Sequence, residues 1–134
     1  MNIILLSGGS GKRLWPLSND IRSKQFIKLF KDDNGNYESM VQRVYRQITT
    51  VNPMVKVTVA TSKNQVSVIK SQLGEKINIC VEPSRRDTFP AILLAAAYIH
   101  YELGIGVEEC IAVCPVDPYV DNDYYKCVGE LEIF

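Results

Sequence analysis

The start of the chain places a short apolar run, Ile3–Leu6, directly before a segment rich in glycine. The run predicts a buried strand, and the glycines let the backbone turn sharply and direct several N–H groups into one concavity. Two cations, Lys12 and Arg13, follow at its rim, so this segment favours a nucleoside triphosphate as ligand. The loop residues predicted to bind the nucleotide are Gly8, Gly9, Ser10, Gly11 and Lys12.

Two better-known phosphate-binding loops do not fit this segment. A P-loop requires a serine or threonine directly after its lysine, but Arg13 follows Lys12, so no hydroxyl is placed to hold magnesium. The dinucleotide-binding fingerprint requires a third glycine, and the chain continues instead with Trp15 and Pro16. An ordinary glycine-rich turn is the remaining alternative, which the arginine and the rigid Trp-Pro pair disfavour.

Length and composition predict one domain with one core, because the chain has 134 residues and 46% of them are hydrophobic. No segment has the apolar length of a membrane helix, and the first apolar run is too short for a signal peptide. The four cysteines form no Cys-x-x-Cys pair, which favours reduced, mostly buried thiols over a zinc site. These observations predict a cytoplasmic protein.

The charge is balanced overall but unevenly distributed. Residues 1–70 carry eleven Lys and Arg against four Asp and Glu, and residues 71–134 carry four against eleven. Solvated helix faces would explain this asymmetry, and so would a phosphate-binding front half that faces a metal-binding back half. The neutral total and the lack of a basic patch with interleaved aromatic residues disfavour a nucleic-acid partner.

Short runs rich in Val and Ile alternate with helical patterns along the chain. The predicted strands are Asn2–Ser7, Lys56–Thr61, Ile77–Glu82 and Cys110–Pro115. The predicted helices are the pattern from Met40 to Ile48, then Lys63–Leu73 and Thr88–Leu103. This alternation predicts a three-layer, Rossmann-like α/β domain with a mostly parallel sheet. Because Ile92–Ile99 is apolar nearly all round, we expect the third helix to be buried.

The residues that suggest chemistry follow the ends of the predicted strands. The glycine loop follows the first strand, Glu82 ends the third and Asp117 comes soon after the fourth. Ligands of parallel α/β sheets bind at the carboxyl ends of the strands, so this shared edge predicts a single site.

Three separated motifs, in the expected order, resemble those of the sugar-1-phosphate nucleotidyltransferases. Gly8–Ser18 is similar to the signature loop of that family, and its Arg-Leu-Trp-Pro-Leu-Ser run most resembles the mannose-1-phosphate guanylyltransferase branch. Ser23–Phe26 resembles the family's Pro-Lys-Gln-Phe, and Val81–Ile92 resembles its Val-Glu-Pro-x-x-Arg-Asn-Thr-x-Pro-Ala-Ile. The resemblance implies a GT-A-like fold that transfers a guanylyl group from GTP to mannose 1-phosphate, giving GDP-mannose and pyrophosphate with the help of Mg²⁺.

Transfer of a nucleotidyl group brings two anions together, so charge neutralisation and alignment should dominate catalysis. Arg13 is predicted to stabilise the phosphates, because its planar fork can hold two oxygens at once, and Lys24 is predicted to add a point charge. The resemblance implies the same duties for both residues. It also implies that Asp117 holds the magnesium ion, which one carboxylate together with phosphate oxygens and water can do.

Glu82 is predicted to select the base. Guanine presents two donors, N1–H and the N2 amine, on one edge, and a carboxylate can accept both, whereas the N1 acceptor of adenine would be repelled. The resemblance implies this role too, and it aligns Arg86 with a nucleotide-binding arginine of the family.

The sequence departs from the family pattern at four positions. Ser23 replaces a proline, which we expect to loosen the segment that presents Lys24, and Asp87 replaces an asparagine. Phe89 replaces a small residue and Pro118 a histidine. None of the four removes a charged group that the reaction needs.

The family's catalytic domain is roughly twice as long as this chain, so residues 1–134 are expected to be its nucleotide-binding half. The second metal ligand and the sugar site would then lie after Phe134. A sheet edge left open in this way predicts self-association into a homo-oligomer. Two alternatives stay open, namely transfer to another sugar or from another base, and a non-catalytic nucleotide-binding module.

Overall fold

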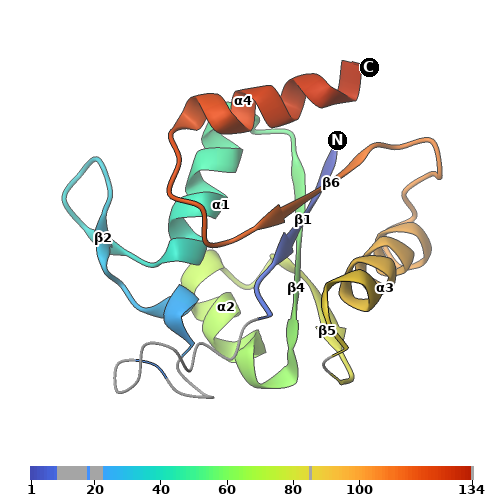
Figure 1. The fold of residues 1–134 in the computed structure, drawn as a ribbon, viewed down its shortest axis with the longest axis horizontal. Helices are drawn as coiled ribbons and strands as arrows, with labels where there is room; N and C mark the ends of the chain where they lie inside the picture. Colours follow the sequence, from blue (N-terminus) through green and yellow to red (C-terminus); the bar gives the residue numbers. More distant parts are fainter. Residues whose placement is uncertain (9–17, 19–22, 85, 134) are drawn as a thin grey trace.

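A four-stranded parallel sheet forms the centre of the protein (Figure 1). The computed structural model describes residues 1–8, 18, 23–84 and 86–133. The strands lie in the order β5, β4, β1, β6, and every neighbouring pair is parallel. Their bounds are β1 Asn2–Leu6, β4 Lys56–Ser62, β5 Asn78–Glu82 and β6 Ile111–Pro115. The predicted α/β class with a parallel sheet is therefore confirmed, and each strand begins and ends within one residue of its predicted position.

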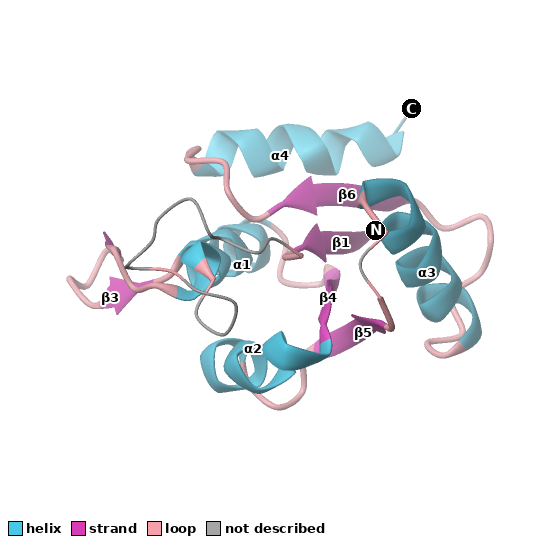
Figure 2. Ribbon diagram, turned by 60° about the horizontal axis from the view of Figure 1, so that its bottom comes forward, coloured by secondary structure: helices cyan, strands magenta, loops and turns pink. Residues whose placement is uncertain are grey.

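Helices cover both faces of the sheet, as the three-layer prediction requires (Figure 2). The helices are α1 Met40–Val51, α2 Val66–Leu73, α3 Thr88–Tyr101 and α4 Asn122–Glu130. Side chains of β1 alternate between the faces, because successive residues of a strand point in opposite directions. Ile3 and Leu5 pack in one cluster with residues of α1, α2 and α4, whereas Ile4 packs with α3 on the other face.

The first of these clusters is the larger core. It joins the apolar side of β1 and β4 to three helices, and its buried members include Ile3, Leu5, Val44, Ile48, Val57, Val59, Ile69 and Tyr125. The second cluster is smaller and is made of Ile4, Ala60, Cys80, Ala95 and Ile99. Burial raises the pKa of the Cys80 and Cys114 thiols, and the cysteines at positions 80, 110, 114 and 127 are all free.

Short elements fill the connections. The 3₁₀ turns are η2 Lys24–Phe26, η3 Lys63–Gln65 and η4 Leu131–Ile133, and a two-stranded antiparallel sheet pairs β2 Phe30–Lys31 with β3 Tyr37–Glu38. The predicted helix Lys63–Leu73 is thus a 3₁₀ turn followed by an α-helix. Among the described helices, none has both the length and the apolar character needed to cross a bilayer.

The prediction that the third helix is buried was wrong. Only Ala91, Ala95 and Ile99 of α3 are buried, while Phe89 and Leu93 are 73% and 59% exposed. A helix that packs against one face of a sheet buries one stripe of side chains. In α3 that stripe carries two alanines, which allow close contact with β1 and β4, and larger apolar side chains point outward.

Helix α3 begins at a strained residue. Asp87 occupies the N-cap position with φ 67° and ψ −172°, and its side chain makes no capping hydrogen bond. This backbone conformation is almost exclusive to glycine and costs other residues about 1–3 kcal/mol. Asp87 is a residue type that often caps helices, but here it lacks the side-chain hydrogen bond that normally stabilises a cap.

We expect the strain at Asp87 to invert the usual order of stability between alanine and glycine. D87G should be more stable than D87A by about 1 kcal/mol, because only glycine adopts this conformation freely. Urea unfolding of both variants measures the difference. At Ser71, on the exposed side of α2, the matched pair S71A and S71G should show the ordinary order, with alanine more stable by about 1 kcal/mol. The same order at both positions would contradict the strain at Asp87.

A second expectation concerns Tyr125, which α4 buries against the larger core. Within the described residues its hydroxyl has no hydrogen-bond partner, and burial raises its pKa to about 12. Above pH 10 the unfolded chain loses this proton while the folded chain keeps it. The free energy of unfolding should therefore fall between pH 10 and pH 12, by about 3 kcal/mol at most.

The variant Y125F should remove that part of the decline and be at least as stable at pH 7, because it deletes a buried donor that has no partner. Thermal or urea unfolding across pH 8–12 measures the difference from wild type. The control is Y101F, since Tyr101 is exposed and its loss should leave the pH profile unchanged. Parallel profiles for wild type and Y125F would show that burial does not perturb Tyr125.

Candidate functional site

The carboxyl ends of all four parallel strands lie at one edge of the sheet (Figure 1). Four predicted site residues belong to the segments at this edge. Gly8 follows β1, Glu82 is the last residue of β5 and Asp117 comes two residues after β6. Lys24 begins the turn η2, which packs against α1. The prediction of a shared edge thus holds for these residues.

Gly8 and Glu82 are close neighbours although β4 separates their strands. A Cβ atom placed on Gly8 would lie 3.2 Å from Oε1 of Glu82, closer than side chains normally approach. The carboxylate therefore lies directly against Gly8, and a side chain at position 8 would require it to move by a few tenths of an ångström. This contact places the candidate base-selecting residue at the entrance of the glycine loop.

Lys24 and Asp117 also meet, from segments far apart in the sequence. The Nζ atom of Lys24 lies 3.6 Å from Oδ2 of Asp117, and their side chains are 37% and 54% exposed. An ion pair this open to solvent contributes about 0–1 kcal/mol to stability. The ion pair therefore contributes little to folding stability, and both charges are accessible to a ligand from the solvent.

The turn that carries Lys24 is fixed to β1. Gln25 is buried, and its Nε2 donates a hydrogen bond to the backbone oxygen of Ser7, the residue just after β1. Within the turn, the N–H of Phe26 donates to the oxygen of Ser23 at 3.0 Å. The residue next to Lys24 is therefore bonded to the backbone at the end of β1.

Helix α1 holds the segment after β6 that carries Asp117. Arg43 Nη2 and Gln47 Nε2 both donate to the backbone oxygen of Val120, at 2.6 and 2.9 Å. The guanidinium of Arg43 also lies 4.2 Å from the centre of the Tyr119 ring. These contacts of Arg43 and Gln47 hold the segment that carries Asp117 against α1.

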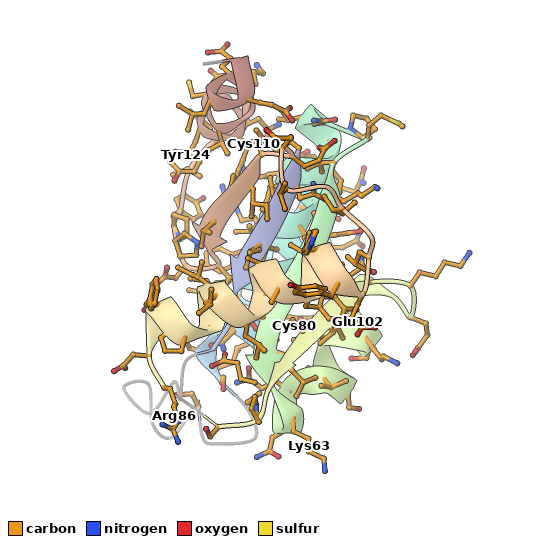
Figure 3. All side chains as sticks on the ribbon, turned by 90° about the vertical axis from the view of Figure 1, so that its right-hand side faces the viewer. Lys63, Cys80, Arg86, Glu102, Cys110 and Tyr124 are labelled. Carbon is orange, nitrogen blue, oxygen red and sulfur yellow. The ribbon has the colours of Figure 1, made fainter. Side chains whose placement is uncertain are left out.

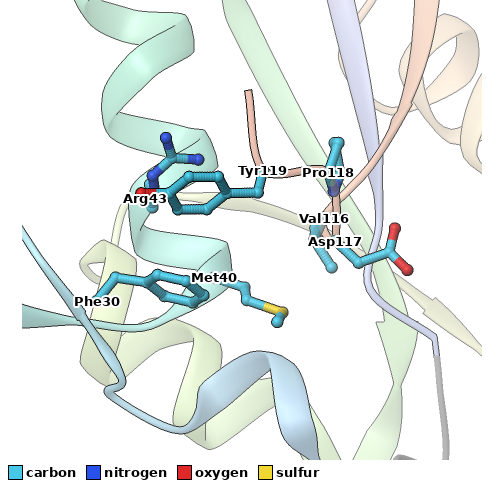
Figure 4. Close-up of a pocket in the computed structure, with 7 residues that line it drawn as sticks. All are labelled: Phe30, Met40, Arg43, Val116, Asp117, Pro118 and Tyr119. Carbon is cyan, nitrogen blue, oxygen red and sulfur yellow. The ribbon is translucent and has the colours of Figure 1, made fainter. Parts of the chain in front are cut away.

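A pocket of about 190 Å³ opens beside Asp117 (Figure 4). Apolar side chains and Arg43 form its walls, and the carboxylate of Asp117 points away from the aromatic rings in this view. Its lining residues are Phe30, Met40, Arg43, Val116, Asp117, Pro118 and Tyr119. Sequence reasoning missed Arg43 and Tyr119, because nothing in their immediate sequence indicates that α1 and the segment after β6 meet.

Arg86 lies in the turn before α3, where it is exposed (Figure 3). Its Nε is 3.3 Å from the hydroxyl oxygen of Ser84, a neighbour in the same turn. Five further predicted residues lie outside the described part of the chain: Gly9, Ser10, Gly11, Lys12 and Arg13. The roles assigned to all of these residues remain predictions.

One carboxylate fits the demands of Mg²⁺ at this edge. Within residues 1–8, 18, 23–84 and 86–133, no three His, Cys, Asp or Glu side chains lie together as a metal site. Mg²⁺ is typically bound by one or two carboxylates together with phosphate oxygens and water, so Asp117 beside a bound triphosphate would suffice. The half-exposed carboxylate leaves room for such ligands.

The sequence is similar to those of several proteins of known or assigned function. The sequence is 34% identical over 96 residues to a putative mannose-1-phosphate guanylyltransferase of Vibrio cholerae, a match that covers 69% of this chain and 20% of that protein. It is 34% identical over 123 residues to the alginate biosynthesis protein AlgA of Pseudomonas putida, covering 89% of this chain and 24% of AlgA. The chain thus spans about a quarter or less of these relatives.

A solved structure from Thermus thermophilus, described as a mannose-1-phosphate geranyltransferase, has the same fold. It superposes with a TM-score of 0.74 at 29% sequence identity, covering 96% of this chain and 36% of that one. The sequence model of the family described as Nucleotidyl transferase matches residues 2–132. Because this match includes nearly every residue, the chain belongs to the nucleotidyl transferase family.

Proposed function

We propose that this chain carries the nucleotide-binding part of a sugar-1-phosphate nucleotidyltransferase that uses GTP and mannose 1-phosphate. The observation that carries the proposal is the meeting of Lys24 and Asp117, a cation for phosphate and a carboxylate for metal, at the edge where the glycine loop begins. The relative of Vibrio cholerae, named as a putative mannose-1-phosphate guanylyltransferase, supports the choice of substrates.

The reaction joins two phosphates. An oxygen of the sugar phosphate attacks the α-phosphorus of GTP, the bond from that phosphorus to the β-phosphate breaks, and pyrophosphate leaves with the electron pair. Lys24 and Arg13 would hold the phosphate oxygens and offset the charge that develops on them. Mg²⁺ held by Asp117 would supply further positive charge at the phosphates.

Glu82 would choose guanine. Its carboxylate lies against Gly8, so a base bound beside the start of the glycine loop would meet it. The two donors on the guanine edge would pair with its two oxygens, and charge-assisted bonds of this kind are about twice as strong as neutral ones. The amide of glutamine offers one acceptor and one donor, so it would meet one of the guanine donors with a donor of its own.

The first experiment tests this base selection. E82Q should weaken GTP binding about tenfold or more, because two hydrogen bonds to a charged group are disturbed. It should not weaken ATP or UTP binding, because the charge that repels the N1 acceptor of adenine is removed. Isothermal titration calorimetry with each nucleotide measures this. The matched control is E75Q, since Glu75 is an exposed glutamate paired with Lys70 away from the site. Equal loss for all three nucleotides in E82Q would contradict base selection by Glu82.

The second experiment tests the metal site. Mg²⁺ should tighten GTP binding to the wild-type chain, and D117N should abolish most of that gain without weakening binding in its absence, because it removes the carboxylate that holds the ion. Calorimetric titrations with and without Mg²⁺ give the ratio of the two affinities. D123N is the matched control, because Asp123 forms a surface ion pair with Lys126, as Asp117 does with Lys24. An unchanged ratio in D117N would exclude Asp117 as the metal ligand.

A further inference from the structure

Ser23 occupies a place where the resembling family motif has proline, a substitution expected to loosen the segment before Lys24. In the structure Ser23 is fully buried, with φ −67° and ψ 151°. A proline ring fixes φ near −65°, so Ser23 holds the backbone angle that proline would impose. A serine has no ring to keep that angle, and some other contact has to restrict it.

The hydroxyl of Ser23 is bound by a buried glutamine. Gln65 Nε2 donates a hydrogen bond to Ser23 Oγ at 2.9 Å, and Thr61 Oγ1 donates to Gln65 Oε1 at 2.7 Å. All three side chains are buried, so the loss of either bond leaves polar groups without a partner away from water. Thr61 lies near the carboxyl end of β4, so the chain of bonds connects Ser23 to an inner strand of the sheet.

A second glutamine holds the other end of the turn. Gln72 Nε2, at the end of α2, donates to the backbone oxygen of Phe26 at 3.0 Å. Gln72 is itself fixed, since Ser39 Oγ donates to its side-chain oxygen at 2.6 Å. The turn η2 is therefore held on both sides of Lys24, while the side chain of Lys24 reaches Asp117.

From these contacts we propose that Gln65 is a positioning residue for Lys24, acting through Ser23. Its hydrogen bond replaces the restriction that a proline at position 23 would give, and so fixes the direction in which Lys24 leaves the turn. This inference rests on the proposed function in one respect, namely that Lys24 binds the phosphates of the nucleotide. If Gln65 had only a structural role, it would stabilise the junction of β4 and η3, and its loss would not change nucleotide binding at Lys24.

The test compares chains in which this bond is removed or replaced. Q65M removes it from the glutamine side and S23A from the serine side, and both should release the turn. If one of the two variants folds poorly, the other still tests the bond. S23P supplies the ring instead, so Q65M should have little effect on the site in that background. I99V is the control for lost stability, because Ile99 is buried in the smaller core behind α3.

Two readouts are measured on each chain. Hydrogen exchange at the amides of Phe26 and Ile27, whose N–H groups bond to Ser23 and Lys24, reports how firmly the turn is held. Calorimetry with GTP and Mg²⁺ reports the site. Q65M and S23A should each speed exchange at both amides and weaken GTP binding about tenfold, the size of coupling that residues in one network show. S23P/Q65M and I99V should match wild type in affinity.

The effect must also pass through Lys24. In a K24M background, Q65M should still speed exchange but change GTP affinity less than about twofold, because the group it positions is gone. Equal weakening with and without Lys24, or no rescue by S23P, would overturn the proposal. If the wild-type chain bound no nucleotide, the proposed function would fail, and unchanged exchange at Phe26 in Q65M would separately overturn the positioning.

Discussion

The parallel pairing of β1 on both of its edges is the interaction on which the rest of this molecule depends. β1 bonds to β4 on one side and to β6 on the other, residue by residue from Asn2 to Leu6. Because the strands run in the same direction, every loop that follows a strand emerges at one edge. Gly8, Glu82 and Asp117 owe their position at one edge to this arrangement, and a shift in register would separate them.

Much of this arrangement could be predicted from the sequence because the signals are local. A run of Val and Ile between polar residues predicts a buried strand wherever it occurs, and alternation with helices predicts a parallel sheet. The helix α3 shows the limit of such signals. An apolar helix does not indicate which of its sides faces the sheet, so the exposure of Phe89 and Leu93 depended on packing that the sequence pattern does not contain.

In the candidate site, too, local motifs could be predicted from the sequence and long-range contacts could not. Lys24, Glu82 and Asp117 could be named from motifs at strand ends, but the residues that hold them could not. Gln65 and Gln72 bond to a turn some forty residues earlier in the chain, with separations of 42 and 46 positions, and Arg43 bonds to a carbonyl 77 positions away. A glutamine or an arginine on a helix looks like any surface residue until the fold brings its partner to it.

The ion pair between Lys24 and Asp117 gives the candidate site a further property. The ammonium of Lys24 and the carboxylate of Asp117 pair with each other, and each is also the group that one proposed ligand would bind. The ligand of Lys24 would be phosphate and that of Asp117 would be Mg²⁺. A cation that takes the carboxylate leaves the ammonium without its partner and so readier for phosphate, and a phosphate that takes the ammonium frees the carboxylate in the same way. By thermodynamic linkage, bound Mg²⁺ would raise the affinity for phosphate by the same factor as bound phosphate raises the affinity for Mg²⁺. An ion pair that contributes little to folding stability would thus make the two binding events cooperative.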